Sequence, residues 1–436
     1  MTPIQSASQF SLTYEWEAPG AIRDEALAAT WARLEITVDG EHITQVEDRG
    51  TGSSRRSVYT SLLPLAEWVA WNWWFLLGHR RGNRILGGAS SARPGTSVWL
   101  RHNLRAAGDG MSWPNLVLAP EGSSTRLSWR ADPSSSNRLV RFVGSGTCSV
   151  DTIVVEQALR GFVDSVTARL RECGINHTPL QDEWAAVRDT PSEERAFCLA
   201  AAALGLDPYD VTPGLATRIV EVAEVLSPED AEQLYHGVSA EHLKAALSWI
   251  GSAVKGKERR PMSPRVVEAR DIGLERVSAS RPWTEGWEQA RLLRRSWGLA
   301  ATDRLDASQL FPVHVERAPD FALVGVGSSR TDGAMLVLGR ESNETGIRFA
   351  QVRALWHAVA RPPVDRFLIT NATTDSAQIE RAFAAEMLVP AEGLREVVSR
   401  VDDPNDDALI EEAAAHFGVS SRVVQHQIEN QLLAVA

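Results

Sequence analysis

The sequence of 436 residues contains little cysteine and has no excess of positive charge. Its three cysteines, Cys148, Cys173 and Cys198, are odd in number and do not have the spacing of a metal-binding motif. With 45 Lys and Arg against 56 Asp and Glu, the formal net charge is −11. This balance argues against a protein that coats nucleic acid or an anionic membrane through bulk electrostatics.

A long hydrophobic run is also missing. The most apolar segment, LPLAEWVAWNWWFLLG at 63–78, is shorter than a membrane-spanning helix and carries Glu67 and Asn72. The N-terminus has no apolar core preceded by positive charge, which a secretory signal would need. We therefore expect a cytoplasmic protein without a membrane segment.

The common signatures of catalysis are absent as well. The sequence contains no His-Glu-x-x-His, no paired Cys motif, no Walker-type phosphate loop and no Gly-x-Ser-x-Gly elbow. The lone Gly-x-Gly in GVGSS at 325–329 is more typical of a strand end and turn than of a nucleotide loop.

The chain is too long for one compact core, and its patterns predict an α+β protein of three domains. We expect an N-terminal antiparallel-sheet α+β domain at 1–178, a helical domain at 179–255, a basic linker at 256–282 and a C-terminal α+β domain at 283–436. In the first domain, RLEITVDGEHITQVED at 33–48 predicts a hairpin that turns at Asp39-Gly40. A helix from about Asp151 is predicted to bury one face made of Val155, Leu159, Phe162, Val166 and Leu170.

Four tryptophans at 68, 71, 73 and 74 raise two possibilities. The rings could form an aromatic cage for a cation or a stacked base, with Trp68 and Trp71 as candidate partner contacts. Alternatively, the spacing of three between Trp68, Trp71 and Trp74 places those rings on one helical stripe that packs on the sheet. We favour the second interpretation.

The C-terminal third carries the most specific pattern. A helix at 288–299 precedes three short apolar runs that fit strands, namely FPVHVERAP, FALVGVGS and AMLVLGRE, and the helix RFAQVRALWHAV follows at 348–359. Then come FAAEMLVP at 383–390 and HFGVSSRVVQHQI at 416–428. In this order the elements resemble the ImmA/IrrE family of zinc metallopeptidase-like proteins. The resemblance implies a zincin-like domain with a terminal helical segment, in a setting of regulation, stress response or phage defence.

The zinc site implied by the resemblance is degenerate here. A zincin helix needs two imidazoles at i and i+4, with a Glu beside the first His as general base. Aligned on Arg348-Phe349, these positions are Arg353, Ala354 and His357, so only the second His remains. The family's third ligand, a Glu, falls near Ala377, one helical turn from Glu380.

These four residues, Arg353, Ala354, His357 and Glu380, are our candidate vestigial active site, with no catalytic residue and no metal ligand assigned. Arg353, His357 and Glu380 could form a hydrogen-bonded cluster, or His357 could simply pack under Trp356 and donate to a backbone carbonyl. Both interpretations stay open from sequence. A peptide could still lie along the sheet edge beside such a site.

The last 30 residues resemble a helix-turn-helix, with a turn at Gly418 and a second helix that presents Arg422, Gln425, Gln427 and Asn430. Six carboxylates at 402–412 would repel phosphate, so we favour partner contacts, with Arg422 and Gln425 as candidates. The apolar residues Phe417, Val419, Val423 and Ile428 are expected to dock this hairpin on the preceding domain.

The leading hypothesis is a non-catalytic ImmA/IrrE-like protein, without a cofactor, that binds a protein or peptide partner. One alternative is an atypical zinc metallopeptidase that uses His357, Glu380 or Asp375 and a distant ligand such as His314. A second alternative is a DNA-binding regulator acting through residues 420–430.

Overall fold

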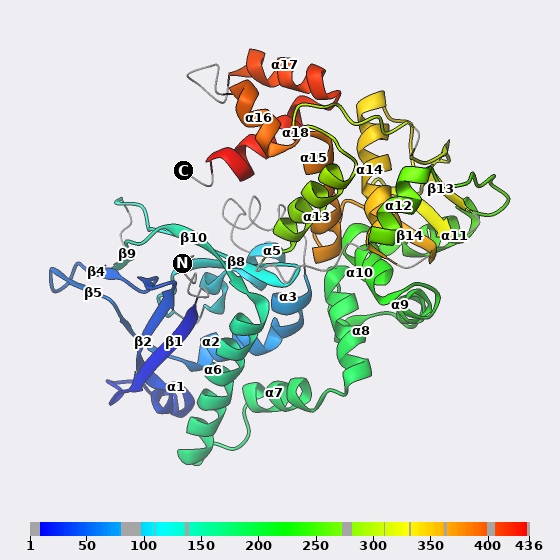
Figure 1. Ribbon diagram of the computed structural model, residues 1–436. Helices are drawn as coiled ribbons and strands as arrows, with labels where there is room; N and C mark the ends of the chain where they lie inside the picture. The colour runs from blue at the N-terminus through cyan, green and yellow to red at the C-terminus, as the bar shows by residue number, and fades with distance from the viewer. Residues whose placement is uncertain are drawn as a thin grey trace. The chain divides into compact units, whose positions relative to one another are not determined.

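The computed structural model describes residues 9–79, 97–108, 110–135, 139–272, 281–308, 310–330, 333–361, 364–398 and 406–433. The chain forms two compact units, Met1–Ile219 and Val220–Ala436. Both units combine helices with mainly antiparallel sheets, which confirms the expected α+β class (Figure 1).

The first unit contains three small antiparallel sheets. The first sheet consists of β1 (Phe10–Trp16), β2 (Trp31–Val38), β3 (Glu41–His42) and β6 (Val58–Ser61). The second consists of β7 (Asn115–Glu121), β8 (Ser124–Arg130) and β10 (Gly146–Asp151), and the third of β4 (Val46–Asp48), β5 (Ser53–Arg55) and β9 (Val140–Phe142). The predicted hairpin is confirmed, since β2 pairs with β3 across a turn in which Asp39 and Gly40 have φ of 50° and 83°.

Helices accompany these sheets in the first unit. They are α1 (Glu25–Ala29), α2 (Leu63–Trp71), α3 (Trp73–Gly78), α5 (Ser97–His102), η1 (Leu104–Ala107), α6 (Thr152–Glu172), α7 (Pro179–Asp189), α8 (Ser192–Ala203) and η2 (Pro208–Asp210). The predicted face of α6 is confirmed: Val155, Leu159, Phe162, Val166 and Leu170 are all buried, and α6 packs against β1, β8 and β10.

The tryptophan segment differs from the expected single stripe. The helix divides at Asn72, which ends α2 and precedes α3, so the period of three is interrupted. Trp68 and Trp74 are buried, whereas Trp71 is 54% exposed. The Trp68 indole Nε1 donates to the Leu100 carbonyl oxygen at 2.6 Å, so Trp68 is part of the core. Of the two candidate partner contacts, only Trp71 is accessible to a partner.

The helices expected at 179–255 are divided between the two units, and the boundary falls inside α9 (Pro213–Val225). The second unit continues with α10 (Pro228–Gly237), η3 (Ala240–His242), α11 (Leu243–Ala253) and α12 (Pro264–Ile272). Helix α12 lies in the segment expected to be a linker. It packs against α14 (Glu344–Ala360) and buries Val266 and Ala269 completely, because this short apolar pair joins the core of the unit.

A four-stranded sheet with the order β11-β13-β12-β14 forms the centre of the second unit. Its strands are β11 (Val313–Val315), β12 (Leu323–Arg330), β13 (Gly333–Leu338) and β14 (Val364–Thr370). The first three strands were predicted, and β14 was not. Helix α13 (Pro282–Ser296) precedes the sheet in the chain. After β14 follow α15 (Asp375–Leu388), α16 (Ala391–Val398), α17 (Asp407–Phe417), α18 (Ser421–Gln427) and the π-helical turn η4 (Ile428–Leu433).

Helices α13 and α15 pack very closely, and Figure 1 shows them side by side. A Cβ atom at Gly286 would lie 2.4 Å from the Ile379 carbonyl oxygen, so only glycine permits this approach of the two backbones. The contact fixes α15 against the unit's core.

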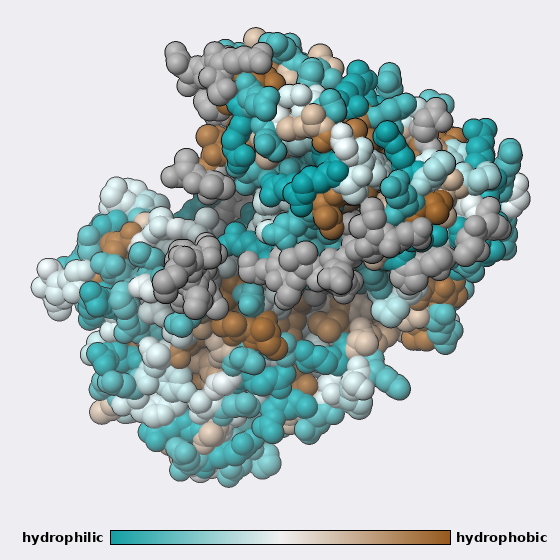
Figure 2. All heavy atoms as spheres, in the orientation of Figure 1, coloured by the Kyte–Doolittle hydropathy of each residue, from teal (hydrophilic) through white to brown (hydrophobic). Residues whose placement is uncertain are grey.

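None of the described helices is long and apolar enough to cross a membrane. On the face drawn in Figure 2, hydrophilic residues predominate and hydrophobic residues form separate patches.

The first unit buries a pair of histidines that the sequence did not draw attention to. His79 Nδ1 lies 2.8 Å from His102 Nε2, and His102 Nδ1 lies 3.0 Å from the Leu118 carbonyl oxygen. A carbonyl only accepts, so His102 Nδ1 must donate to it, and Nε2 then accepts from His79 in the neutral ring. Burial is the main reason that the pKa of His102 falls from 6.5 to about 4.

This arrangement predicts an acid-sensitive first unit. Because the folded state keeps His102 neutral, its contribution to stability is complete above about pH 6.5 and is lost as the pH falls towards 4. The difference between 6.5 and about 4 corresponds to about 3 kcal/mol of unfolding free energy. Urea unfolding at pH 7.5 and pH 4.5 should show most of this loss in the wild type and much less in His102→Gln. The exposed His177→Gln is the control, and an unchanged pH dependence in His102→Gln would contradict the assignment.

Candidate functional site

Helix α14 carries three of the four residues of the expected vestigial site, Arg353, Ala354 and His357, and α15 carries the fourth, Glu380. Helix α14 begins after Asn343, whose side-chain oxygen accepts from the Gly346 amide at 2.9 Å. Most side chains from Arg348 to Val359 are buried, so the helix is enclosed on nearly all sides. Any charge on this segment therefore needs a partner inside the protein.

Arg353, His357 and Glu380 form one buried cluster. The Arg353 guanidinium makes an ion pair with Glu380 Oε1 and donates to the Thr370 carbonyl oxygen at 2.6 Å. On the other carboxylate oxygen, His357 Nε2 donates to Glu380 Oε2 at 2.6 Å. The three side chains are 3%, 0% and 0% exposed. Of the two interpretations left open by the sequence, the structure shows the hydrogen-bonded cluster. His357 Nε2 donates to the Glu380 carboxylate and not to a backbone carbonyl.

The ring of Phe367 on β14 holds His357 in place. The two rings are stacked, with centroids 4.4 Å apart and an interplanar angle of 8°. Behind Phe367, a Cβ atom at Gly327 would lie 2.1 Å from the Phe367 Cζ atom. Gly327 thus creates the space in which Phe367 can lie flat against the imidazole.

Helix α10 closes the outer side of β14. The Leu368 amide donates to Asp230 Oδ1 at 3.0 Å, and the Thr370 hydroxyl donates to Gln233 Oε1 at 2.9 Å. Burial raises the pKa of Asp230. Sequence reasoning missed both residues, because SPEDAEQLYHGV reads as an ordinary capped helix. The edge of the sheet at Leu368 is therefore covered. The expected binding of an extended peptide along a sheet edge cannot occur at this position.

The electrostatics of the cluster favour an ionised carboxylate. Desolvation opposes the charge on Glu380, but Arg353 and His357 outweigh it, so the pKa of Glu380 is lowered. This carboxylate contributes stability above its ordinary pKa, and the contribution is lost as the pH falls through the lowered value.

The donor set does not fit a zinc ion. A catalytic zinc needs three protein ligands, whereas this cluster offers one imidazole and one carboxylate whose oxygens are already occupied. Ala354 and Ala377 are buried but carry no ligand atom. His314 lies on β11, at the sheet edge opposite β14, and its Nε2 faces the Glu258 carbonyl oxygen at 3.4 Å. Asp375 begins α15, five residues before Glu380. In the described part of the chain, no three His, Cys, Asp or Glu side chains are grouped to hold a metal.

A cleft of about 300 Å³ opens beside Arg353, which we call the arginine cleft. One side is the first turn of α14 with the preceding loop, and another is the turn before α18. The ends of three strands form its floor. It is lined by Val324, Leu338, Arg340, Ser342, Asn343, Thr345, Gly346, Phe349, Ala350, Arg353, Asn371, Arg381, Val419, Ser420 and Val423.

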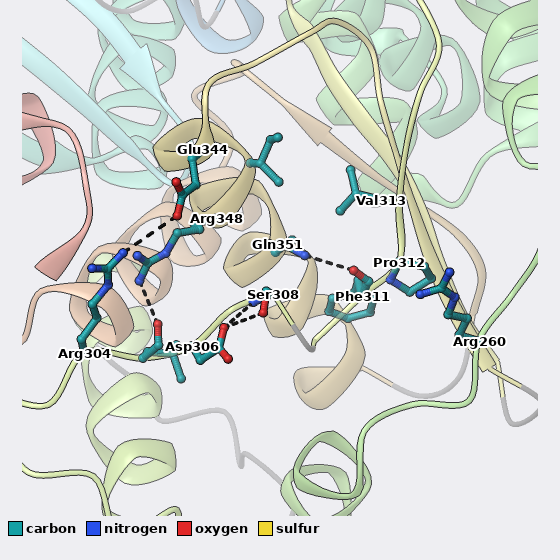
Figure 3. A pocket seen from close by; sticks show the side chains of 12 residues that line it. Arg260, Arg304, Asp306, Ser308, Phe311, Pro312, Val313, Glu344, Arg348 and Gln351 are labelled. Carbon is teal, nitrogen blue, oxygen red and sulfur yellow. Dashed lines mark hydrogen bonds and ion pairs between the residues drawn. The ribbon is translucent and has the colours of Figure 1, made fainter.

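A second cavity of about 750 Å³ carries charges of both signs (Figure 3). Arg348 reaches across it and donates to the carbonyl oxygens of Leu305 at 2.8 Å and Phe417 at 3.3 Å. The Phe417 carbonyl ends α17, so the cation stabilises the negative end of that helix. Arg304 pairs with Glu344 at 4.0 Å. Arg348 thus serves a structural role, whereas Arg304 and Glu344 form an exposed pair.

The terminal hairpin is docked on the unit as expected. Phe417, Val419 and Ile428 are buried and Val423 is partly buried in the same core as α14 and α15. The buried carboxylate of Glu386 accepts from Gln427 Nε2 at 3.0 Å and from Gln431 Nε2 at 2.7 Å. Gln427, expected on the outer face, therefore points inward.

The remaining candidates of the hairpin are on the surface. Arg422, Gln425 and Asn430 are exposed. Arg422 Nε lies 3.4 Å from His426 Nε2, and the Asn430 amide donates to the His426 carbonyl oxygen at 2.8 Å. Arg422 and Gln425 remain available for a partner.

Comparison with known proteins gives no relative. No family model matches the chain, and no curated protein or solved structure shows significant similarity to it.

The cluster makes a specific prediction about stability. Replacing Glu380 by Gln leaves the buried Arg353 guanidinium without its counter-charge, and we expect a loss of about 3–5 kcal/mol of unfolding free energy. Chemical denaturation at pH 7 followed by circular dichroism measures it. Glu268→Gln, on the exposed face of α12, is the matched control and should change stability by less than about 0.5 kcal/mol. Equal effects of the two substitutions would show that the ion pair is unimportant.

Proposed function

We propose that this is a non-catalytic, ImmA/IrrE-like binding protein that recognises a protein or peptide partner in regulation or defence. The observation that carries the proposal is the buried cluster of Arg353, His357 and Glu380. Arg353 and His357 lie on α14 at the positions where the sequence resemblance implies metal ligands, and Glu380 reaches them from α15.

The chemistry of the cluster supports a binding role over peptide hydrolysis. Zinc peptidases use the metal to polarise a carbonyl and to activate water, with a neighbouring Glu as base. Here the cationic guanidinium of Arg353 takes the place of one imidazole, and Ala354 takes the place of the base. A dication would be repelled by Arg353, and the Glu380 carboxylate is already neutralised by it.

The surface for the partner is best assigned to the terminal hairpin. Arg422 and Gln425 are exposed on α18, and the turn before this helix lines the arginine cleft through Val419 and Ser420. The alternative position along β14 is blocked at Leu368 by Asp230. Trp71 is the remaining exposed candidate in the first unit, while Trp68 is buried.

A gain-of-metal experiment tests the zincin-like scaffold. In Arg353→His, two imidazoles at i and i+4 would stand beside the Glu380 carboxylate, which already lies 2.6 Å from His357 Nε2. We expect Arg353→His to retain about one zinc per chain after purification, as measured by elemental mass spectrometry.

Two controls make this result specific. Arg353→Gln removes the same charge without adding an imidazole and should retain no zinc. The scaffold assignment is wrong if Arg353→His and Arg353→Gln retain equal amounts of zinc. About one zinc per chain in the wild type would instead favour the metallopeptidase alternative.

Capture of the partner tests the binding role. Cross-linked complexes from cells that encode the protein should contain an intact partner, and the double variant Arg422→Ala/Gln425→Ala should lose it. The double variant Glu411→Ala/Glu412→Ala, on the exposed face of α17, is the matched control and should retain the partner. A partner that is cleaved by the wild type but not by His357→Ala would contradict the non-catalytic proposal.

A further inference from the structure

We propose that the arginine cleft is a binding site for a small organic anion, in which a phosphate or carboxylate group meets the arginines and an apolar body meets the apolar side chains that line the cleft. This site does not depend on the binding of a macromolecular partner. It also differs from the metal chemistry implied by the sequence resemblance, since its ligand would be held by cations of the protein.

The charges that line the cleft are all positive. Arg340, Arg353 and Arg381 contribute guanidinium groups, and none of the described lining residues is Asp or Glu. Only Arg353 has a carboxylate partner among the described residues, because Glu380 binds it from behind. Arg381 uses one nitrogen to donate to the Ala372 carbonyl oxygen and forms no ion pair with a described residue. An anion in the cleft would supply the missing negative charge.

Two of these arginines also have unused donors. Arg353 is 3% exposed, and its Nε atom has no hydrogen-bond partner among the described residues. The same holds for Arg340 Nη1, on a guanidinium that lies 3.8 Å from the centroid of the Phe321 ring. A buried donor without an acceptor is costly, and native proteins usually supply a partner for it. Because these two atoms are themselves buried, they show that the guanidinium groups are incompletely paired, and a phosphate or carboxylate in the cleft would meet the atoms of these side chains that line it.

The closeness of Arg353 and Arg381 also favours the binding of an anion. Burial, followed by repulsion from Arg353, lowers the pKa of Arg381 to about 10. A bound anion would offset the repulsion between the two guanidinium groups.

The backbone adds to this positive field. Helix α14 has 17 residues, and its first turn lines the cleft through Thr345 and Gly346. The N-terminal end of a helix carries a partial positive charge and commonly binds anionic groups. Together with three guanidinium groups, it sets the chemical class of the ligand.

The size and the remaining walls indicate a small organic molecule. A volume of about 300 Å³ lies at the lower end of the range for small-molecule sites. Val324, Leu338 and Phe349 give the cleft an apolar wall, which an inorganic ion would leave unused. The larger cavity differs, because Asp306 and Glu344 stand among its arginines (Figure 3).

The test uses phenyl phosphate and benzoate as anionic probes with an apolar ring, and benzyl alcohol as the uncharged control. Isothermal titration calorimetry on the full chain at constant ionic strength should detect binding of at least one anion and none of the alcohol. Arg340→Gln should bind that anion about 10- to 100-fold more weakly, as expected for the loss of one charge-assisted hydrogen bond. Arg340 is suitable because it is partly exposed and its removal leaves the buried cluster intact.

Arg260→Gln is the matched control, since it removes the same charge from the wall of the other cavity. It should bind the anion as the wild type does. Ser420→Trp, which fills the mouth of the cleft from an exposed position, should abolish binding and gives a second variant if Arg340→Gln does not fold. Failure of both anions to bind, or equal losses in Arg340→Gln and Arg260→Gln, would overturn the proposal.

Discussion

The buried ion pair between Arg353 and Glu380 is the constraint on which the arrangement of the second unit depends. A guanidinium that is 3% exposed requires a counter-charge and acceptors within reach. Glu380 supplies the charge and the Thr370 carbonyl supplies an acceptor, so α14, α15 and β14 must meet at one point. Because both charges lose their hydration, the pair adds little net stability. Either partner alone would be a buried, uncompensated charge, so the fold must keep the two side chains in contact.

A second buried carboxylate on α15, that of Glu386, makes contacts from another face of that helix. Glu386 follows Glu380 by six residues, which places the two side chains on different helical faces. Arg291 donates to Glu386 Oε1 at 2.9 Å, and the amides of Gln427 and Gln431 donate to Oε2. One helix thus joins the central sheet through Glu380 and the terminal hairpin through Glu386. This carboxylate explains why Gln427 and Gln431 of the hairpin point inward.

The sequence predicts the local elements of this protein well and the long-range contacts poorly. The turn at Asp39-Gly40, the buried face of α6 and the apolar face of the terminal hairpin follow from short-range periodicity and turn chemistry. The strand β14 was not predicted, because VDRFLIT carries Asp365 and Arg366 beside its apolar residues and follows Pro362-Pro363, so it lacks the continuous apolar run of its neighbours. Asp230 and Gln233 were missed because nothing local links them to Leu368 and Thr370, more than 130 residues away. The members of the buried cluster could be named from the resemblance to a zincin helix, but which of them pair, and through which atoms, could not.

The buried cluster and the arginine cleft are physically connected through one side chain. Arg353 directs one nitrogen towards Glu380 and Thr370 and leaves its Nε without a partner while it lines the cleft. Because Glu380 holds the guanidinium plane, the orientation of Nε is set by the core and does not depend on a flexible surface chain. A site built in this way keeps a fixed positive charge at the cleft without any bound metal. Arg353 therefore brings to the cleft a positive charge whose position is fixed by the buried cluster, and the proposed anion site depends on this arginine.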